Sequence, residues 1–427
     1  MQASYLSGML VVLTPCCSFP YYIDWMQSMS KINRSERSFT FGGLTENVIS
    51  PDPRSRAWVE VDSKIIENNA RVLKNFIGDD CSLMAVVKAD GYGHGAETVA
   101  KSALTGGADS LGVATLEEGI QLRNAGLKCQ ILILGNLINS DELYSSFCWD
   151  LIPTISGIRE AIICNNIAEN KHKKFFIHLK VDTGMTRLGC DCDEVKDLIS
   201  KIDYLENISL KGIYSHLAIA DKDLEKNTKL NFTQIQVTRF EKVLKDLGAR
   251  NKSLCRHLAN SAGTLSDSRL HFDMVRVGLS LYGYFPVNDF ESDLRLKPAL
   301  KVKSRVTLVR EVEKGIGVGY GHFFKTQRKS KLAVVAIGYA DGVSRNLSGK
   351  ISASIDGVLV PQVGAIAMDQ MVFDITDKPD IKTGQVLTLL GTDGEVCISP
   401  QNWCDLSGSI PWEVLCGFRN RLPRVVT

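Results

Sequence analysis

Short apolar segments alternate with longer amphipathic segments from residue 56 to residue 298. The apolar segments are rich in β-branched residues, which favour strands, and the segments between them repeat apolar residues every three or four positions, which favours helices. After an initial apolar segment at 57–62, eight strands are predicted at 83–88, 110–114, 130–134, 151–155, 175–181, 210–216, 255–260 and 272–277. Helices are predicted between them, for example at 64–76, 97–104 and 232–247.

Eight strands that alternate with helices predict an α/β fold, a (β/α)8 barrel of the TIM type, over residues 55–299. A doubly wound open sheet is the alternative, because it would give a similar alternation. Such a sheet usually carries a Gly-x-Gly-x-x-Gly turn after its first strand, and no such turn follows here. The barrel is therefore the favoured fold.

The pattern changes after Pro298, where helical periodicity gives way to short strands separated by turns that contain Gly and Asp. Strands are predicted at 302–309, 332–337, 351–355, 371–375 and 386–390. This pattern predicts a smaller all-β domain over residues 300–427. Because no long Pro- or Ser-rich linker separates the two domains, they should pack closely, with the active site at the barrel mouth beside the second domain.

Residues 1–54 differ from the rest and predict a separate N-terminal extension. Their apolar patch at 9–13 is far shorter than the roughly 20 residues that a bilayer span needs. The first basic residue is Lys31, so the positively charged start of a secretory signal is missing, although a signal stays an alternative. A disordered tail, or a start codon assigned upstream of Met26 or Met29, explains the segment at least as well.

Composition indicates a globular protein that acts on a small molecule. Among 427 residues, 44% are hydrophobic and 23% are charged, and the formal net charge is only +2. This balance gives no basic surface for nucleic acid or membrane binding. The twelve cysteines form no Cys-x-x-Cys pair, so we expect free thiols in the cytoplasm and no metal site. Cys190 and Cys192 could touch a metal, but no second pair accompanies them.

Chemistry in a barrel gathers where the strands end, and the first predicted barrel strand ends in Lys88. Burying an unpaired ammonium costs free energy, so a lysine in this place often has a lowered pKa or forms a covalent bond. Lys88 is therefore a candidate for Schiff-base chemistry. The alternative is a lysine whose amine extends from the barrel top into water.

Further charged side chains follow the fifth and sixth strands. Lys180 lies in the fifth, and Arg187, whose planar fork can bind a carboxylate with two hydrogen bonds, follows it. His216 closes the sixth strand, where a packing role is as plausible as a functional one. These positions place a lysine and an arginine near Lys88.

The seventh and eighth strands end in residues that suit a phosphate. Barrels often bind phosphate after these two strands, through backbone N–H groups, a hydroxyl and the start of a short helix. The candidates are Asn260 and Ser261 after the seventh strand and Arg276, Gly278 and Leu279 at the end of the eighth.

The most specific segment of the chain is Ala-Val-Val-Lys-Ala-Asp-Gly-Tyr-Gly-His-Gly at 85–95, and segments 180–187, 317–321, 337–342 and 368–370 follow it. Taken together and in this order, these motifs resemble the alanine racemase family over residues 56–426. The resemblance implies a barrel followed by a β domain, and a homodimeric enzyme that depends on pyridoxal phosphate. It implies interconversion of L-alanine and D-alanine, which supplies D-alanine for peptidoglycan.

The resemblance also implies roles for individual residues. Lys88 would hold the cofactor covalently and act as one of two catalytic bases, and Tyr320 would be the other, supplied by the second subunit. Arg187 and the backbone N–H of Met368 would hold the substrate carboxylate. The remaining cofactor contacts would come from the phosphate-binding group Tyr92, Asn260, Ser261, Gly278 and Leu279, and from Arg276 at the pyridine nitrogen with His216 behind it. Lys180 matches a position that is often carbamylated.

Two positions depart from the family pattern. Asn420 stands where a tyrosine is common, and losing that ring would widen the pocket, so L-serine becomes a plausible second substrate. Ala365 replaces a more usual arginine, which changes the charge of the access channel. The alternatives are therefore a racemase of broader or serine specificity, and a non-catalytic pyridoxal phosphate carrier. A carrier would not need Tyr320 or Arg187.

Overall fold

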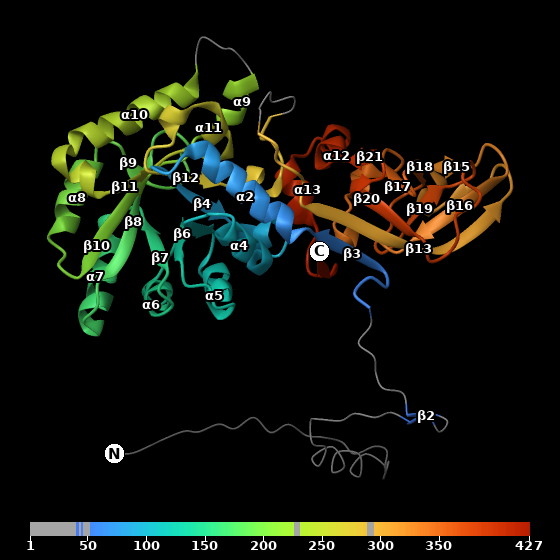
Figure 1. Cartoon of the computed structure of the whole chain (residues 1–427), viewed down its shortest axis with the longest axis horizontal. Helices are drawn as coiled ribbons and strands as arrows, with labels where there is room; N and C mark the ends of the chain where they lie inside the picture. Colours follow the sequence, from blue (N-terminus) through green and yellow to red (C-terminus); the bar gives the residue numbers. More distant parts are fainter. Residues whose placement is uncertain (1–39, 42–43, 46–51, 226–230, 288–293) are drawn as a thin grey trace, which may run out of the picture. The chain divides into compact units, whose positions relative to one another are not determined.

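A computed structural model describes residues 40–41, 44–45, 52–225, 231–287 and 294–427 (Figure 1). The chain divides into two units, Met1–Asp52 and Pro53–Thr427. In the first unit, strands β1 (Thr40–Phe41) and β2 (Leu44–Thr45) pair in antiparallel fashion. The extension expected over 1–54 otherwise lies almost entirely outside the described residues.

The second unit contains a closed ring of eight parallel strands, which confirms the predicted barrel. Its order is β4, β5, β6, β7, β8, β10, β11 and β12, and β12 pairs with β4 to close the ring. All eight predicted segments are strands, with these bounds: β4 (Ser82–Val86), β5 (Ser110–Val113), β6 (Gln130–Asn136), β7 (Ile152–Ile155), β8 (Phe175–Asp182), β10 (Ile208–Tyr214), β11 (Cys255–His257) and β12 (Met274–Val277). A two-residue strand, β9 (Cys190–Asp191), adds to β8.

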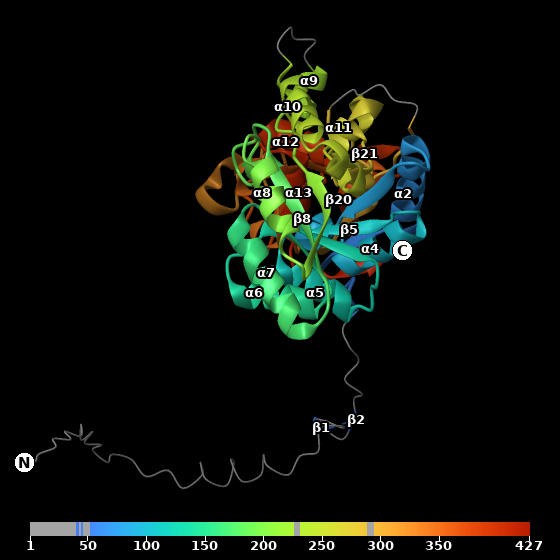
Figure 2. The same cartoon turned by 90° about the vertical axis from the view of Figure 1, so that its left-hand side faces the viewer.

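Helices follow the barrel strands and lie outside them, as both views show for α5 to α8 (Figure 1, Figure 2). The helices of this layer are α2 (Ser63–Ile77), α4 (Ala96–Thr105), α5 (Leu116–Asn124), α6 (Ser140–Cys148), α7 (Ile158–Lys171), α8 (Val195–Asp203), α9 (Ala220–Glu225), α10 (Phe232–Asp246) and α11 (Ser261–Ser266). The segment α3 (Lys88–Tyr92) follows β4 but has left-handed backbone inside it and is a turn rather than a regular helix. Short 3-10 helices are η2 (Gly248–Ser253), η3 (Ser268–Leu270) and η4 (Leu279–Tyr282). Side-chain caps explain several helix starts, since Asp62 accepts the N–H groups of Lys64 and Ile65, and Thr115 and Glu118 form a capping box.

The initial apolar segment, β3 (Ala57–Val61), belongs to the second sheet and not to the barrel. It pairs antiparallel with β13 (Leu300–Val312) and parallel with β22 (Arg424–Val426). The barrel boundary drawn at residue 55 is therefore wrong, since the barrel layer starts at α2. Sequence could not reveal this, because an apolar strand before a helix fits either sheet.

The second domain is built mostly of strands, as expected. Six of them close a ring of antiparallel pairs in the order β13, β20, β17, β18, β19 and β16. The strands other than β3, β13 and β22 are β14 (Gly317–Val318), β15 (Phe324–Lys325), β16 (Ser330–Val335), β17 (Ser352–Ile355), β18 (Val358–Val363), β19 (Met371–Asp374), β20 (Val386–Asp393) and β21 (Val396–Ile398). The 3-10 helices are η5 (Tyr320–His322), η6 (Tyr339–Asp341) and η7 (Arg345–Leu347).

Two short helices, α12 (Pro400–Ser407) and α13 (Pro411–Gly417), interrupt the strands near the end of the domain. Each begins with a proline at its first turn, which is a helix-start signal that the all-β prediction overlooked. Each domain has its own apolar core, and partly buried Trp412 of α13 packs against both. None of the helices in the described part of the chain is long and apolar enough to cross a membrane.

Candidate active site

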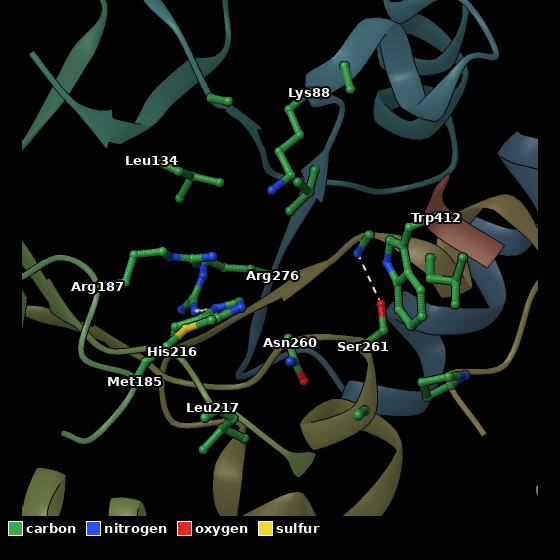
Figure 3. Close-up of a pocket in the computed structure, with 18 of the residues that line it drawn as sticks. Lys88, Leu134, Met185, Arg187, His216, Leu217, Asn260, Ser261, Arg276 and Trp412 are labelled. Carbon is green, nitrogen blue, oxygen red and sulfur yellow. Dashed lines mark hydrogen bonds between the residues drawn. The ribbon is translucent and has the colours of Figure 1, made fainter. Parts of the chain in front are cut away.

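A cavity of about 690 Å³ opens at the carboxyl ends of the barrel strands. It brings together most of the residues singled out in the sequence, namely Lys88, Tyr92, Lys180, Arg187, His216, Asn260, Ser261, Arg276, Gly278 and Leu279. In Figure 3, Lys88 points into this space opposite Arg187 and Arg276. Trp412 and Cys416 of α13 complete part of the wall, so the second domain contributes to the cavity.

The backbone after Lys88 makes a left-handed turn. The five residues from Ala89 to Gly93 all have positive φ, between 49° and 79°, and three of them are not glycine. Left-handed backbone costs an L-residue roughly 1–2 kcal/mol, so other interactions must stabilise this turn. The turn reverses the chain direction within a few residues, so Lys88 and Tyr92 both line the cavity.

Glu118 is one of the groups that stabilise the turn. Its carboxylate accepts the N–H groups of Ala89 and Ala114, both at 2.7 Å. The Asp90 side chain accepts the N–H of Ala96 at 2.9 Å, which joins the turn to the first residue of α4. The sequence signal for Glu118 was its capping-box spacing from Thr115, but nothing in that spacing indicated a contact with Ala89.

Lys88 is placed to act as a nucleophile or a base. Burial lowers the pKa of its amine, the positive charge of Arg187 lowers that pKa further, and Glu118 opposes both effects. A larger fraction of the amine is therefore neutral near pH 7 than for an exposed lysine, and the neutral amine is the reactive form.

Arg276 is fixed deep in the barrel, with only 3% of its surface exposed. Its Nη1 donates to His257 Nδ1 at 3.1 Å, and its Nη2 donates to His216 Nδ1 at 3.0 Å and to the Ser215 carbonyl at 2.7 Å. Burial lowers the pKa of Arg276 to about 10, so the guanidinium stays charged at neutral pH. Arg276 therefore presents a fixed positive charge to the cavity.

These contacts also set the protonation of the neighbouring histidines. Arginine has no acceptor atom, so the Nδ1 atoms of His216 and His257 must be unprotonated. Neutral His257 then carries its hydrogen on Nε2 and donates it to His178 Nδ1, 3.0 Å away. Burial, followed by the charge of Arg276, lowers the pKa values of His216 and His257 well below the ordinary value.

Mild acid is expected to destabilise the fold through its buried histidines. Burial lowers the pKa values of His94 and His178 to about 4, whereas in the unfolded chain both titrate near 6.5. Between pH 4 and pH 6.5 the two histidines bind protons in the unfolded chain but not in the folded one. The free energy of unfolding is therefore highest above pH 6.5 and falls as the pH drops toward 4. From pH 7.5 to 5.5 the free energy of unfolding should fall by about 1.4 kcal/mol for each histidine.

Urea unfolding at these two pH values checks this, because carboxylates remain ionised at both. The variant His172→Gln, which changes an exposed histidine at the end of α7, serves as a control and should show the same loss as the unaltered protein. Equal stability at pH 7.5 and 5.5 would contradict the assignment.

Lys180 lies in the buried wall of the cavity, its Nζ 5.4 Å from the centroid of the Tyr214 ring. Burial, followed by the charges of Arg276 and Arg187, lowers the pKa of Lys180 to about 8. Tyr214, which sequence reasoning missed, stacks on His257 at 4.6 Å between ring centroids. It is the last residue of β10, but a buried tyrosine at a strand end gives no distinctive sequence signal.

The phosphate candidates meet on one side of the cavity. Ser261 Oγ accepts the N–H groups of Gly278 at 3.1 Å and Ser280 at 3.4 Å (Figure 3 shows the first). A Cβ atom at position 278 would lie 2.6 Å from the Tyr92 hydroxyl, so only glycine lets that hydroxyl lie there. The Asn260 side chain caps α11 by accepting the N–H of Gly263 at 3.0 Å.

Tyr320 and Met368 do not line the cavity of the same chain. They lie on the second domain with 71% and 52% of their surfaces exposed. Two contacts fix the loop that contains Met368. The Met368 carbonyl accepts the N–H of Ala340 at 3.0 Å, and Arg421 forms a 2.7 Å salt bridge with Asp369. The two residues are therefore held on an exposed face.

Within the described residues, no group of three or more His, Cys, Asp or Glu side chains could hold a metal ion. The cavity instead gathers a lysine, arginines and N–H groups. A closed barrel with such a cavity, joined to a strand-rich domain, defines a class of two-domain barrel proteins whose cavity presents a lysine amine beside arginine side chains.

Comparison with known proteins identifies the family within that class. The chain matches the N-terminal domain of alanine racemase over residues 61–286 and the C-terminal domain over residues 299–426. It therefore belongs to the alanine racemase family, and the resemblance found in the sequence is confirmed.

Similar proteins cover nearly the whole of this region. An alanine racemase of Prochlorococcus marinus is 58% identical over 376 residues, which is 88% of this chain and 97% of the relative. The structure of the Clostridium difficile 630 alanine racemase has a TM-score of 0.81 at 34% identity and covers 87% of this chain and 96% of that one. The Bacillus anthracis alanine racemase with bound L-Ala-P has a TM-score of 0.80 at 32% identity, covering 88% and 96%.

Proposed function

We propose that this protein interconverts L-alanine and D-alanine with pyridoxal phosphate held by Lys88. The observation that carries the proposal is the cavity in which Lys88, with its lowered pKa, faces Arg187 and Arg276. Family membership supports the choice of reaction, as does the Bacillus anthracis relative, which was solved with L-Ala-P.

The chemistry of the cavity fits pyridoxal phosphate. A lysine amine of lowered pKa suits its aldehyde, and the Tyr92 hydroxyl and the glycine at 278 lie together where a phosphate would be bound. Arg276 would meet the ring nitrogen as a donor that does not give up its proton at neutral pH. When bound, this cofactor withdraws electrons from the substrate Cα, which makes the Cα proton removable.

Racemisation needs one acid/base group on each face of Cα, so that a proton leaves from one side and returns from the other. Lys88 supplies the first, and its lowered pKa suits a base near neutral pH. We propose Tyr320 as the second. Because Tyr320 is exposed on the second domain, it would act in the cavity of a second copy, so the active form is a homodimer.

The substrate carboxylate would bind to Arg187 and to the Met368 N–H of the second copy. Lys180 supports a related proposal, because a pKa of about 8 leaves part of its amine neutral, and only a neutral amine adds carbon dioxide. The resulting carbamate would orient Arg187. A carbamate signal in ¹³C NMR after equilibration with labelled bicarbonate, lost in Lys180→Arg, tests this; its absence from the unaltered protein refutes it.

We further propose that the D-alanine serves peptidoglycan precursors in the cytoplasm. A reducing compartment fits the cysteines of the described residues, which are free thiols.

The test of the main proposal is a chiral-product assay on protein reconstituted with pyridoxal phosphate, with L-alanine and L-serine run side by side. D-alanine should dominate. Comparable or greater D-serine would favour the broader racemase, and turnover of neither would favour the carrier. Asn420, the residue that raised the serine alternative, is exposed and does not line the cavity of its own chain.

A further inference from the structure

Arg424, at the start of β22, links the end of the second domain to the turn that follows Lys88. Its Nε donates at 3.0 Å to the carbonyl of Gly93, and Gly93 is the last residue of the left-handed turn. The remaining donors bind the chain's own C-terminal segment: Nη1 donates to the carbonyls of Arg419 and Leu422 at 2.7 and 2.8 Å, and Nη2 donates to Phe418. A 3.7 Å ion pair joins Nη2 to Asp90.

These contacts use the whole guanidinium. Arginine has five N–H donors in a fixed planar fork, and each of the three nitrogen atoms donates to at least one backbone carbonyl here. Only 14% of the Arg424 side chain is exposed, and three of its four hydrogen bonds to carbonyls are partly buried. The guanidinium therefore fixes the position of the turn relative to the segment 418–422.

Close packing at the same place supports the link. A Cβ atom at Gly93 would lie 2.3 Å from the Leu415 carbonyl, so α13 lies directly against the turn. The residue after Leu415 is Cys416, which lines the cavity beside Lys88. A shift of the turn away from α13 would thus move Lys88 and change the cavity wall together.

The turn needs such support because it is strained. Ala89, Asp90 and Tyr92 are left-handed without being glycine, a conformation that L-residues rarely adopt. Glu118 fixes the beginning of the turn through Ala89, and Arg424 fixes its end through Gly93. Lys88 precedes the turn and Tyr92 lies within it, so the contacts of Glu118 and Arg424 hold two residues that line the cavity.

We propose that Arg424 is a positioning residue, which holds the left-handed turn so that the Lys88 amine meets the cofactor. This rests on the proposed function only in that Lys88 is taken to bind pyridoxal phosphate. Lysine cannot replace Arg424, because a single ammonium cannot reach four carbonyls spread around a planar fork.

The chain offers a matched control in Arg123, the next-to-last residue of α5. Its guanidinium also donates to four backbone carbonyls, those of Leu127, Cys129, Trp149 and Asp150, at 2.7 to 3.0 Å. Arg123 does not line the cavity. Arg123→Lys therefore loses a similar set of hydrogen bonds without touching the turn.

The experiment compares Arg424→Lys with Arg123→Lys in the full-length protein. Melting temperatures should fall in both, but only Arg424→Lys should weaken pyridoxal phosphate binding, by about tenfold or more, while Arg123→Lys stays within about twofold. The visible absorbance of the lysine-bound cofactor should also titrate at a different pH in Arg424→Lys alone. Equal cofactor affinity and equal titration in the two variants would overturn the proposal.

Two further measurements keep the test decisive. If Arg424→Lys does not fold, Asp90→Asn removes the ion pair while keeping an oxygen for the Ala96 N–H, and it should weaken cofactor binding by about threefold. The pH dependence of Lys88 acylation in protein without cofactor reports the environment of the amine directly. In Arg424→Lys the amine should titrate closer to an ordinary lysine, and an unchanged titration would count against the proposal.

These outcomes separate this proposal from the proposed function. If the unaltered protein binds pyridoxal phosphate but does not racemise alanine, the function fails and the comparison of Arg424 with Arg123 still stands. If it does not bind the cofactor at all, the function fails and the acylation measurement decides the role of Arg424. If racemisation is normal but both arginine variants behave alike, only the Arg424 proposal fails.

Discussion

Lys88→Ala is expected to abolish covalent binding of pyridoxal phosphate and to lower racemisation by more than about 10³-fold. The variant loses both the amine that joins the cofactor and one of the two bases, and no other described lysine except Lys180 lines the cavity. Visible absorbance of the reconstituted protein and a chiral assay for D-alanine measure the two effects.

The control is Lys101→Ala, which removes an exposed lysine whose partner, Glu97, lies on the same helix. It should keep both absorbance and activity. If Lys88→Ala kept the absorbance of a lysine-bound cofactor, the wrong lysine would have been chosen, and Lys180 would be the next candidate.

Tyr320→Phe is expected to bind the cofactor as tightly as the unaltered protein but to lose racemase activity by roughly 10²- to 10⁴-fold, the usual contribution of an acid/base group. The Tyr320 side chain is exposed in its own chain, so removing its hydroxyl should leave the melting temperature unchanged. Tyr204→Phe, which alters another exposed tyrosine, should be fully active. Full activity of Tyr320→Phe would refute the two-base assignment.

Mixing the two inactive variants tests whether sites are shared between copies. A mixed dimer of Lys88→Ala and Tyr320→Phe has one site with both changes and one site with neither, provided that Tyr320 acts in the cavity of the second copy. Activity should therefore return on mixing, to at most half the normal activity per mixed dimer. If the mixture stayed inactive although mixed dimers formed, the two bases would belong to the same chain.

The barrel could be predicted because its evidence is local. Most strands of the ring are apolar segments bounded by helical periodicity, and the fold rule then places the carboxyl ends of all eight together. The fold rule therefore predicted that Lys88, Arg187 and Arg276 lie close together, and all three line one cavity. Their catalytic roles stay predictions.

Other features depend on contacts between distant residues, which periodicity does not encode. The sheet that contains β3 depends on pairing with β13, more than 200 residues later, and the Lys88 turn depends on Glu118 and Arg424. A run of left-handed residues is also invisible in composition, because Ala89 and Tyr92 have no special tendency toward positive φ. The short helix α13 has too few turns to show periodicity, so Trp412 and Cys416 were missed.

The place of β3 in the second sheet has a consequence for the order of folding. The whole barrel is inserted, in the topological sense, between β3 and β13, which pair over Ala57–Val61 and Leu300–Ser304. Closing so long a loop is slow, so β3 should join its sheet only after the barrel has brought its two ends together. A fragment cut at residue 300 would lack β3 and expose the unpaired edge of β13, which is a template for aggregation. The boundary that separates the two domains in sequence therefore does not divide the protein into two independently folding pieces.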